Sequence, residues 1–117
     1  MDYTELDVWK HSRELVKLVY QLTKLFPKEE LYGLTSQIRR SSISVPSNIA
    51  EGIGRQSNKE TIHFLYIAKG SLQELETQLY LSFDLEYISE EQLKDILKKV
   101  VSNKKLLNGF INYFKKL

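Results

Sequence analysis

The side chains in this sequence that could take part in catalysis are few and widely spaced. Only His11 and His63 are available as imidazole bases or metal ligands, and no HxxxH or carboxylate spacing around them makes a metal site. No serine stands in a recognisable triad with either histidine. The two glycines of "EGIGR" end a helical pattern and do not form a phosphate loop. The sequence therefore predicts a protein that is not an enzyme and has no metal or cofactor; an RNase using an arginine with His63 is the enzymatic alternative.

Three arginines have the chemistry to bind phosphate. A guanidinium group presents a planar fork of N–H donors that matches the oxygens of a phosphate or a carboxylate. Arg39, Arg40 and Arg55 are therefore predicted nucleic-acid contacts. The same fork suits salt bridges within the chain or between subunits, and the candidate carboxylate partners are Glu51, Glu74 and Glu76.

A row of lysines near the C-terminus is the second basic feature. Four of them fall within about 40° of one another on a helical wheel, opposite the apolar residues of the same segment: Lys94, Lys98, Lys105 and Lys116. A phosphate backbone favours such a row, because each neutralised phosphate releases condensed counterions. The alternative is that these lysines only solvate the outer face of a bundle helix.

Several aromatic residues could stack on nucleic-acid bases. They are Trp9, Tyr20, Tyr66, Tyr80 and Tyr113. Tyrosines at helical spacing more commonly lie at the edge of a core with the hydroxyl in water. Both interpretations stay open from the sequence alone.

The composition is that of an ordinary globular protein. The chain has 117 residues, 42% hydrophobic and 27% charged, with a formal net charge of +2 and no cysteine. This length predicts a single domain over residues 1–117. The absence of cysteine suits a reducing compartment, and neither a signal peptide nor an apolar stretch long enough to span a membrane is evident. We therefore expect a cytoplasmic protein.

Four segments show helical periodicity and none shows strand alternation. The first runs over Asp7–Phe26 and must end before Pro27, and the second runs over Leu34–Arg55. Two further helices begin after the capping patterns "SNKE" and "SEEQ", in which Ser57 and Ser89 supply the caps. Long helices joined by short loops predict an all-α, antiparallel, up-down four-helix bundle.

The second helical segment contains a proline. Ile38, Val45 and Ile49 share one face, which should enter the core. Pro46 has no N–H, so the Ser42 carbonyl loses its intrahelical partner. The sequence predicts one helix with a kink near Pro46, the alternative being two separate helices.

The same segment is unusually rich in small residues: Ser41, Ser42, Ser44, Ser47, Ala50, Gly52 and Gly54. Glycine costs about 0.5–1 kcal/mol relative to alanine in a helix interior, but it allows another backbone to approach closely. Apolar residues outside the main stripe also exceed what one core face needs, and such surplus indicates association. The predicted oligomer interface comprises Ile43, Ser47, Ala50, Glu51 and Gly54, with Arg40 and Glu51 as candidate ion-pair partners there; a solvated surface is the alternative.

At this point the sequence resembles a known family. The stretch "QIRRSSISVPSNIAEG", preceded by "VWKHSRELVKLVY" and "FPKEELYGL" and followed by "FLYIAKGSLQELETQL", is similar to the four-helix-bundle proteins encoded in intervening sequences of bacterial 23S ribosomal RNA. The resemblance covers Leu6 to Ile88. A related branch is the accessory variability protein of diversity-generating retroelements, a basic pentameric barrel that contacts reverse transcriptase and nucleic acid.

The resemblance implies a ring-like homo-oligomer, with five subunits preferred, and a role associated with RNA or DNA. It implies no reaction. Together with the basic residues, it predicts a non-enzymatic, homo-oligomeric protein that binds nucleic acid, with structured RNA as the expected partner. The alternative is a protein–protein adaptor, for example a partner of a reverse transcriptase, without direct contact to nucleic acid.

Overall fold

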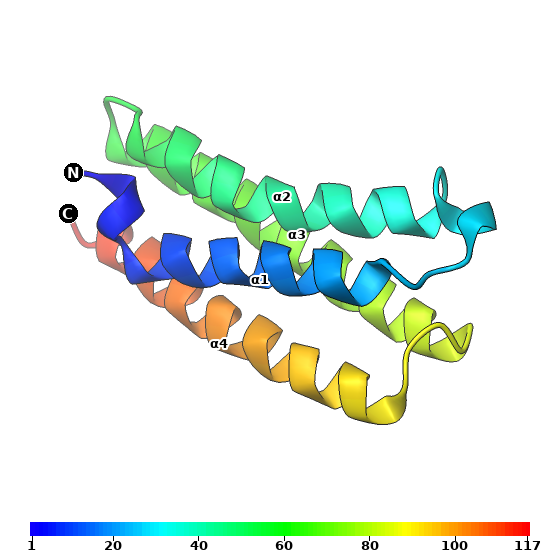
Figure 1. The fold of residues 1–117 in the computed structure, drawn as a ribbon. Helices are drawn as coiled ribbons and strands as arrows, with labels where there is room; N and C mark the ends of the chain where they lie inside the picture. Colours follow the sequence, from blue (N-terminus) through cyan, green and yellow to red (C-terminus); the bar gives the residue numbers. More distant parts are fainter.

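Four long helices make up the fold. The computed structural model describes all of residues 1–117, and its α-helices are α1 (Asp7–Thr23), α2 (Leu34–Ile53), α3 (Asn58–Asp84) and α4 (Glu90–Lys115). Two 3₁₀ turns, Tyr3–Glu5 and Lys28–Glu30, precede α1 and α2, and no strand is present. Successive helices run in opposite directions, and both termini lie at the same end of the bundle (Figure 1). The prediction of an all-α four-helix protein is confirmed.

The helix ends follow local hydrogen-bonding chemistry, with small shifts from the predicted bounds. Helix α1 ends at Thr23 and not at Phe26, whose side chain nevertheless enters the core from the following turn. Helix α2 ends at Ile53, because Gly54 closes it by donating to the carbonyls of Ala50 and Glu51.

The two predicted capping patterns differ in their completeness. At the start of α4, Ser89 accepts from the Gln92 backbone N–H and the Gln92 side chain accepts from the Ser89 N–H, so the capping box is complete. At the start of α3, Ser57 accepts from the Glu60 N–H, but the Glu60 carboxylate turns to the Ser57 hydroxyl at 3.3 Å. Only half of that box therefore forms.

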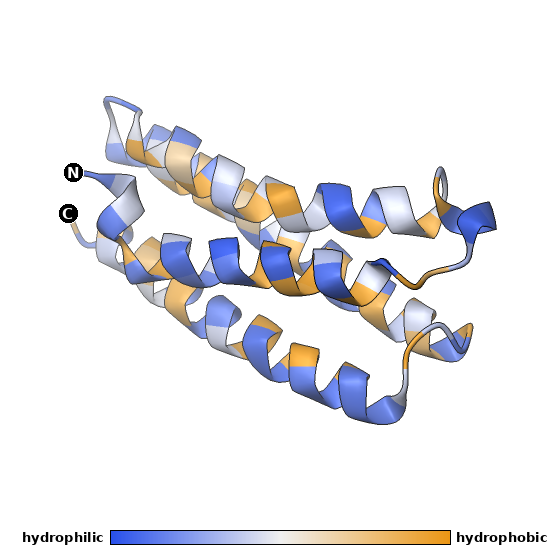
Figure 2. Ribbon diagram, viewed as in Figure 1, coloured by the Kyte–Doolittle hydropathy of each residue, from blue (hydrophilic) through white to orange (hydrophobic).

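One continuous apolar core lies between the helices. Its fully buried side chains include Ile38, Val45 and Ile49 from α2, as the spacing predicts. Apolar residues line the inner sides of the ribbons while polar residues face outward (Figure 2). Other apolar residues of the four helices are only half-buried at the margin of this cluster: Leu18, Leu22, Ile53, Ile62, Phe83 and Leu97.

Helix α2 continues through Pro46 without interruption. The alternative of two separate helices is therefore wrong, whereas the kink stays a prediction. The Ser42 hydroxyl donates to the Arg39 carbonyl at 2.8 Å, which satisfies a polar group in the buried stripe.

Small residues let α2 and α3 pack closely. Ser44 and Ser71 share a hydrogen bond of 2.8 Å across the two helices, and the Ser41 hydroxyl donates to Gln78 at 2.6 Å. Nearer the loop, the Thr61 hydroxyl donates to the Gly52 carbonyl at 2.7 Å. The contacts with α3 thus account for three of the small residues of α2, Ser41, Ser44 and Gly52, without a second subunit.

The loops at the other end of the bundle are joined by a polar contact. Tyr87 lies in the loop before α4. Its hydroxyl donates to the Glu30 carboxylate at 2.7 Å, and the Leu34 N–H donates to the same carboxylate at 3.2 Å. These hydrogen bonds lower the pKa of Glu30, with the bond from Tyr87 as the main cause. The pKa of Tyr87 is raised, first by its bond to Glu30 and then by burial and the nearby carboxylate charges.

This contact predicts a defined pH dependence of stability. The lowered pKa of Glu30 contributes stability above its ordinary value of 4.5, which is lost as the pH falls through the folded value. The raised pKa of Tyr87 contributes stability below its ordinary value of 10.0, which is lost as the pH rises through the folded value. Tyr87→Phe should therefore be less stable than the wild type near pH 7, and this difference in stability should become smaller in acid. Urea denaturation at pH 7 and at about pH 3 measures the difference, and an equal difference at both values would refute the role of the contact.

Candidate interaction surfaces

Each candidate arginine contacts groups of its own chain. Arg39 donates from Nε to the Thr23 hydroxyl at 2.9 Å, and its guanidinium lies 4.6 Å from the centre of the Tyr20 ring. Tyr20 therefore supports a cation–π contact in this structure. This arginine is partly buried and is held against α1.

The other two arginines form the ion pairs that the sequence offered as the alternative. Arg40 pairs with Glu74 of α3 at 2.6 Å, and Arg55 pairs with Glu51 one helical turn earlier at 3.0 Å. Arg55 also lies 4.5 Å from the centre of the Phe64 ring. Both pairs are solvent-exposed, and such pairs contribute little stability, so an incoming phosphate could compete for the guanidinium groups.

The lysines of α4 have few carboxylate partners. All four predicted contacts are exposed, and only Lys94 forms an ion pair, with Glu90 at 3.2 Å. Lys98, Lys105 and Lys116 pair with no carboxylate. From Ile96 to Leu117 the chain contains six lysines and no Asp or Glu. Apart from Lys104, which pairs with Glu76 of α3, these lysines have no carboxylate partner, so this part of the chain presents a surface of positive charge.

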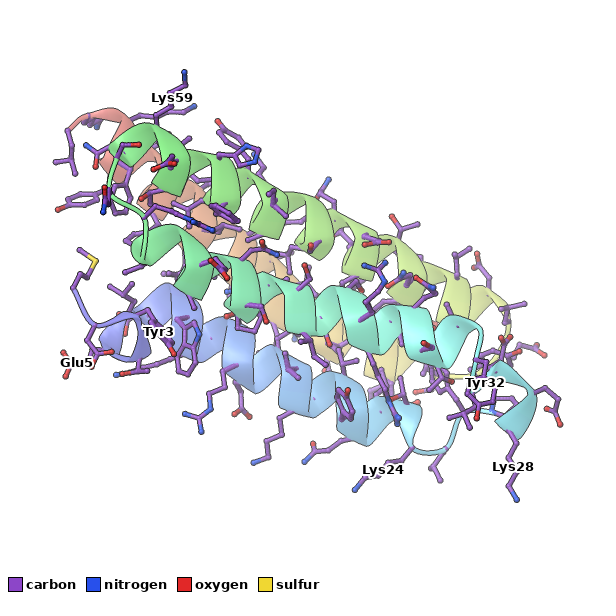
Figure 3. All side chains as sticks on the ribbon, turned by 90° about the horizontal axis from the view of Figure 1, so that it is seen from above. Tyr3, Glu5, Lys24, Lys28, Tyr32 and Lys59 are labelled. Carbon is purple, nitrogen blue, oxygen red and sulfur yellow. The ribbon has the colours of Figure 1, made fainter.

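The residues predicted to form the oligomer interface lie together on α2. One shallow hollow of about 360 Å³ is lined by Ser47, Ala50, Glu51, Gly54 and Arg55. A neighbouring hollow of about 340 Å³ shares two of these residues and lies between α2 and the N-terminal part of the chain; its lining includes Tyr3, Trp9, Val16, Ile43 and Pro46. Tyr3 stands at the end of the bundle that also carries Lys59 (Figure 3). The five predicted residues thus form one partly apolar face.

Sequence reasoning missed a cluster that joins α3 and α4. Lys69 and Lys115 both lie against the ring of Tyr66, with their Nζ atoms 5.9 Å and 5.2 Å from its centre. The spacing of Tyr66 and Lys69, three residues apart, could have indicated that these two share a face. The contribution of Lys115 depends on the rotation of α4 against α3, which no pattern within either segment specifies.

No group of three or more His, Asp or Glu side chains comes together in a way that could hold a metal ion. His11 and His63 are both exposed, and they lie on different helices. None of the helices combines the length and apolar character needed to cross a lipid bilayer.

The fold is that of a small four-helix protein with no strand. Residues 4–109 match the model of the 23S rRNA-intervening sequence protein family, and the chain belongs to this family. A solved structure from Bacteroides thetaiotaomicron, described as a protein of unknown function from the S23 ribosomal protein family, is 32% identical with a TM-score of 0.81. The similarity covers 90% of this chain and 95% of that one. None of the curated proteins matches the sequence.

Proposed function

We propose that this chain is a cytoplasmic, non-enzymatic, homo-oligomeric protein that associates with structured RNA through the basic surface of α4. The observation that carries the proposal is the stretch from Ile96 to Leu117, which contains six lysines and no Asp or Glu, and in which five of the six lysines form no ion pair. Exposed ammonium groups without ion-pair partners are free to neutralise phosphates and release their counterions.

Assembly would strengthen this surface. The family resemblance favours a ring of five subunits, in which the lysine row would be repeated once in every subunit. Fields of the same sign add over such a ring, and the summed potential steers a polyanion toward it. A modest net charge of +2 on each chain is therefore compatible with RNA binding.

Binding to a fluorescently labelled RNA hairpin tests the proposal. Fluorescence anisotropy over a range of salt concentrations should show an affinity that falls steeply with salt. The variant Lys98→Gln/Lys105→Gln should reduce the slope of log K against log salt by about two, because each lysine contacts a separate phosphate.

A matched control removes the same charge elsewhere. Lys17 and Lys24 lie exposed on or just after α1 and form no ion pair, so Lys17→Gln/Lys24→Gln should keep the wild-type slope. Absence of RNA binding by the wild type at low salt would exclude the proposed function. Cleavage of the hairpin during the incubation would instead show that the protein is a nuclease.

Exposed apolar residues on α3 favour a second candidate, the protein–protein adaptor. Ile67, Tyr80 and Leu81 of this helix remain exposed although they are large and apolar. We take these exposed apolar side chains as the candidate contacts for such a partner. Recovery of one protein partner that survives nuclease treatment, and that is lost in Leu81→Asp, would favour the adaptor over the RNA-binding protein.

A further inference from the structure

The cluster of Tyr66, Lys69 and Lys115 has no role in the packing of the core. Tyr66 is 43% exposed, and the two lysines reach it from different helices. The ion pairs of this chain involve Arg40, Arg55, Lys94 and Lys104, so neither lysine of the cluster has a carboxylate partner. Two ammonium groups therefore lie near one phenol ring with no carboxylate paired to either of them.

The two helical stretches that carry the cluster contain no acidic side chain. No Asp or Glu occurs between Thr61 and Gln73 of α3, nor from Ile96 to the end of the chain. The two stretches meet where α3 begins and α4 ends (Figure 1). The pKa of Tyr66 is lowered, chiefly by its hydrogen bonding to Lys115 and further by the charges of both lysines, which is the response expected of a phenol in a positive field.

The approach to the phenol is open. Gly70 follows Tyr66 by one helical turn, so its side chain would have covered the same face. No atom lies within 4 Å of the position that a Cβ of Gly70 would take. The face of α3 beside Tyr66 is therefore not covered by a side chain at position 70, and Tyr66 remains exposed to solvent.

We propose that Tyr66, Lys69 and Lys115 together bind a single phosphate group of the RNA backbone. This inference rests on the proposed function and adds to it a site distinct from the row formed by Lys98 and Lys105. The two ammonium groups supply charge to one phosphate, and the Tyr66 hydroxyl donates a hydrogen bond to one of its oxygens.

The number of phosphates bound provides the test. Two lysines that share one phosphate neutralise it once, so Lys69→Gln/Lys115→Gln should reduce the salt slope for the labelled hairpin by about one. The pair Lys98→Gln/Lys105→Gln reduces it by about two, and the control Lys17→Gln/Lys24→Gln leaves it unchanged. Tyr66→Phe should weaken binding without changing the slope, because it removes a neutral donor.

A measurement without RNA separates this site from the proposed function. The ring signals of Tyr66 in an NMR spectrum should shift on titration with pyrophosphate at low salt in the wild type, and should not shift in Lys69→Gln/Lys115→Gln. Such a shift supports the site even where the hairpin does not bind, an outcome that excludes only the proposed function. Three results would overturn the shared site. The first two are a salt slope in Lys69→Gln/Lys115→Gln that equals the wild-type slope or is reduced by two. The third is the absence of any shift of the Tyr66 signals when pyrophosphate is added to the wild type.

Discussion

Replacing Gly52 by alanine should destabilise the fold by about 1–3 kcal/mol, although the same change in a helix interior ordinarily stabilises. A Cβ on Gly52 would lie 3.0 Å from the Cβ of Phe64 and 3.1 Å from the carbonyl oxygen of Thr61. Both atoms belong to the rigid part of α3, so the two helices would have to move apart. Such a movement also strains the hydrogen bond from the Thr61 hydroxyl to the Gly52 carbonyl.

Two other glycines of the same chain provide matched controls. Gly70 and Gly109 also stand inside helices, but nothing lies within 4 Å of the position that their Cβ would take. Gly70→Ala and Gly109→Ala should therefore stabilise by about 0.4–1 kcal/mol, because alanine lowers the entropy of the unfolded chain. Urea denaturation of the three variants measures the difference. If Gly52→Ala stabilises as its controls do, the close approach of α2 and α3 is not the reason for this glycine.

The patterns on which the family resemblance rests meet in the structure. The stretches quoted above contain the patterns Q-x-R-R (residues 37–40), S-x-P-x-N-I-A-E-G (44–52) and G-S-x-x-E (70–74). Arg40 of the first pairs with Glu74 of the third, and Ser71 of the third hydrogen-bonds Ser44 at the start of S-x-P-x-N-I-A-E-G. Gly52, which ends that last pattern, lies against the first turns of α3. These residues specify how α2 and α3 pair. The resemblance therefore implies a fold strongly while it implies no reaction.

The periodicity of the sequence predicted the elements and the core of α2 because both depend on local spacing. Caps such as Ser89 act within four residues, and a stripe such as that of Ile38 and Ile49 repeats on one helix. Pairing between helices is different, because it depends on how each helix is rotated about its axis. The small residues of α2 show the consequence, since spacing could not tell that Ser44 faces α3 while Ser47 faces solvent.

The same limit applied to the candidate site. Long side chains such as those of Arg40 and Arg55 can reach several partners. From the sequence alone, either a phosphate or a carboxylate could be the partner of each arginine. The structure places a carboxylate beside each of them, while Lys98 and Lys105 remain without one. Lys115 joins Tyr66 and Lys69 only through the contact of α3 with α4, so no pattern within one helix indicated the complete cluster.

The proposed ring predicts that Gly54→Tyr separates the oligomer into monomers without unfolding the chain. Gly54 has φ −78° and ψ −3°, which a tyrosine adopts without strain, and the atoms nearest to its Cβ position are carbonyls of its own helix at 3.5 Å and 3.8 Å. The monomer therefore accommodates the new side chain. A neighbouring subunit packed on the face of Ala50 and Gly54 does not, because a close contact between backbones leaves no room for an aromatic ring.

Size-exclusion chromatography with light scattering measures the outcome, and circular dichroism shows whether the helices persist. Gly109→Tyr is the control, because it adds the same side chain to an open position on α4 and should keep the wild-type mass. A wild type that is monomeric at every concentration would refute the ring, and a dimer would exclude five subunits while keeping a self-contact. A full-sized oligomer in Gly54→Tyr would place the subunit contact on another face, for which the exposed Ile67 and Leu81 of α3 are the next surface to mutate.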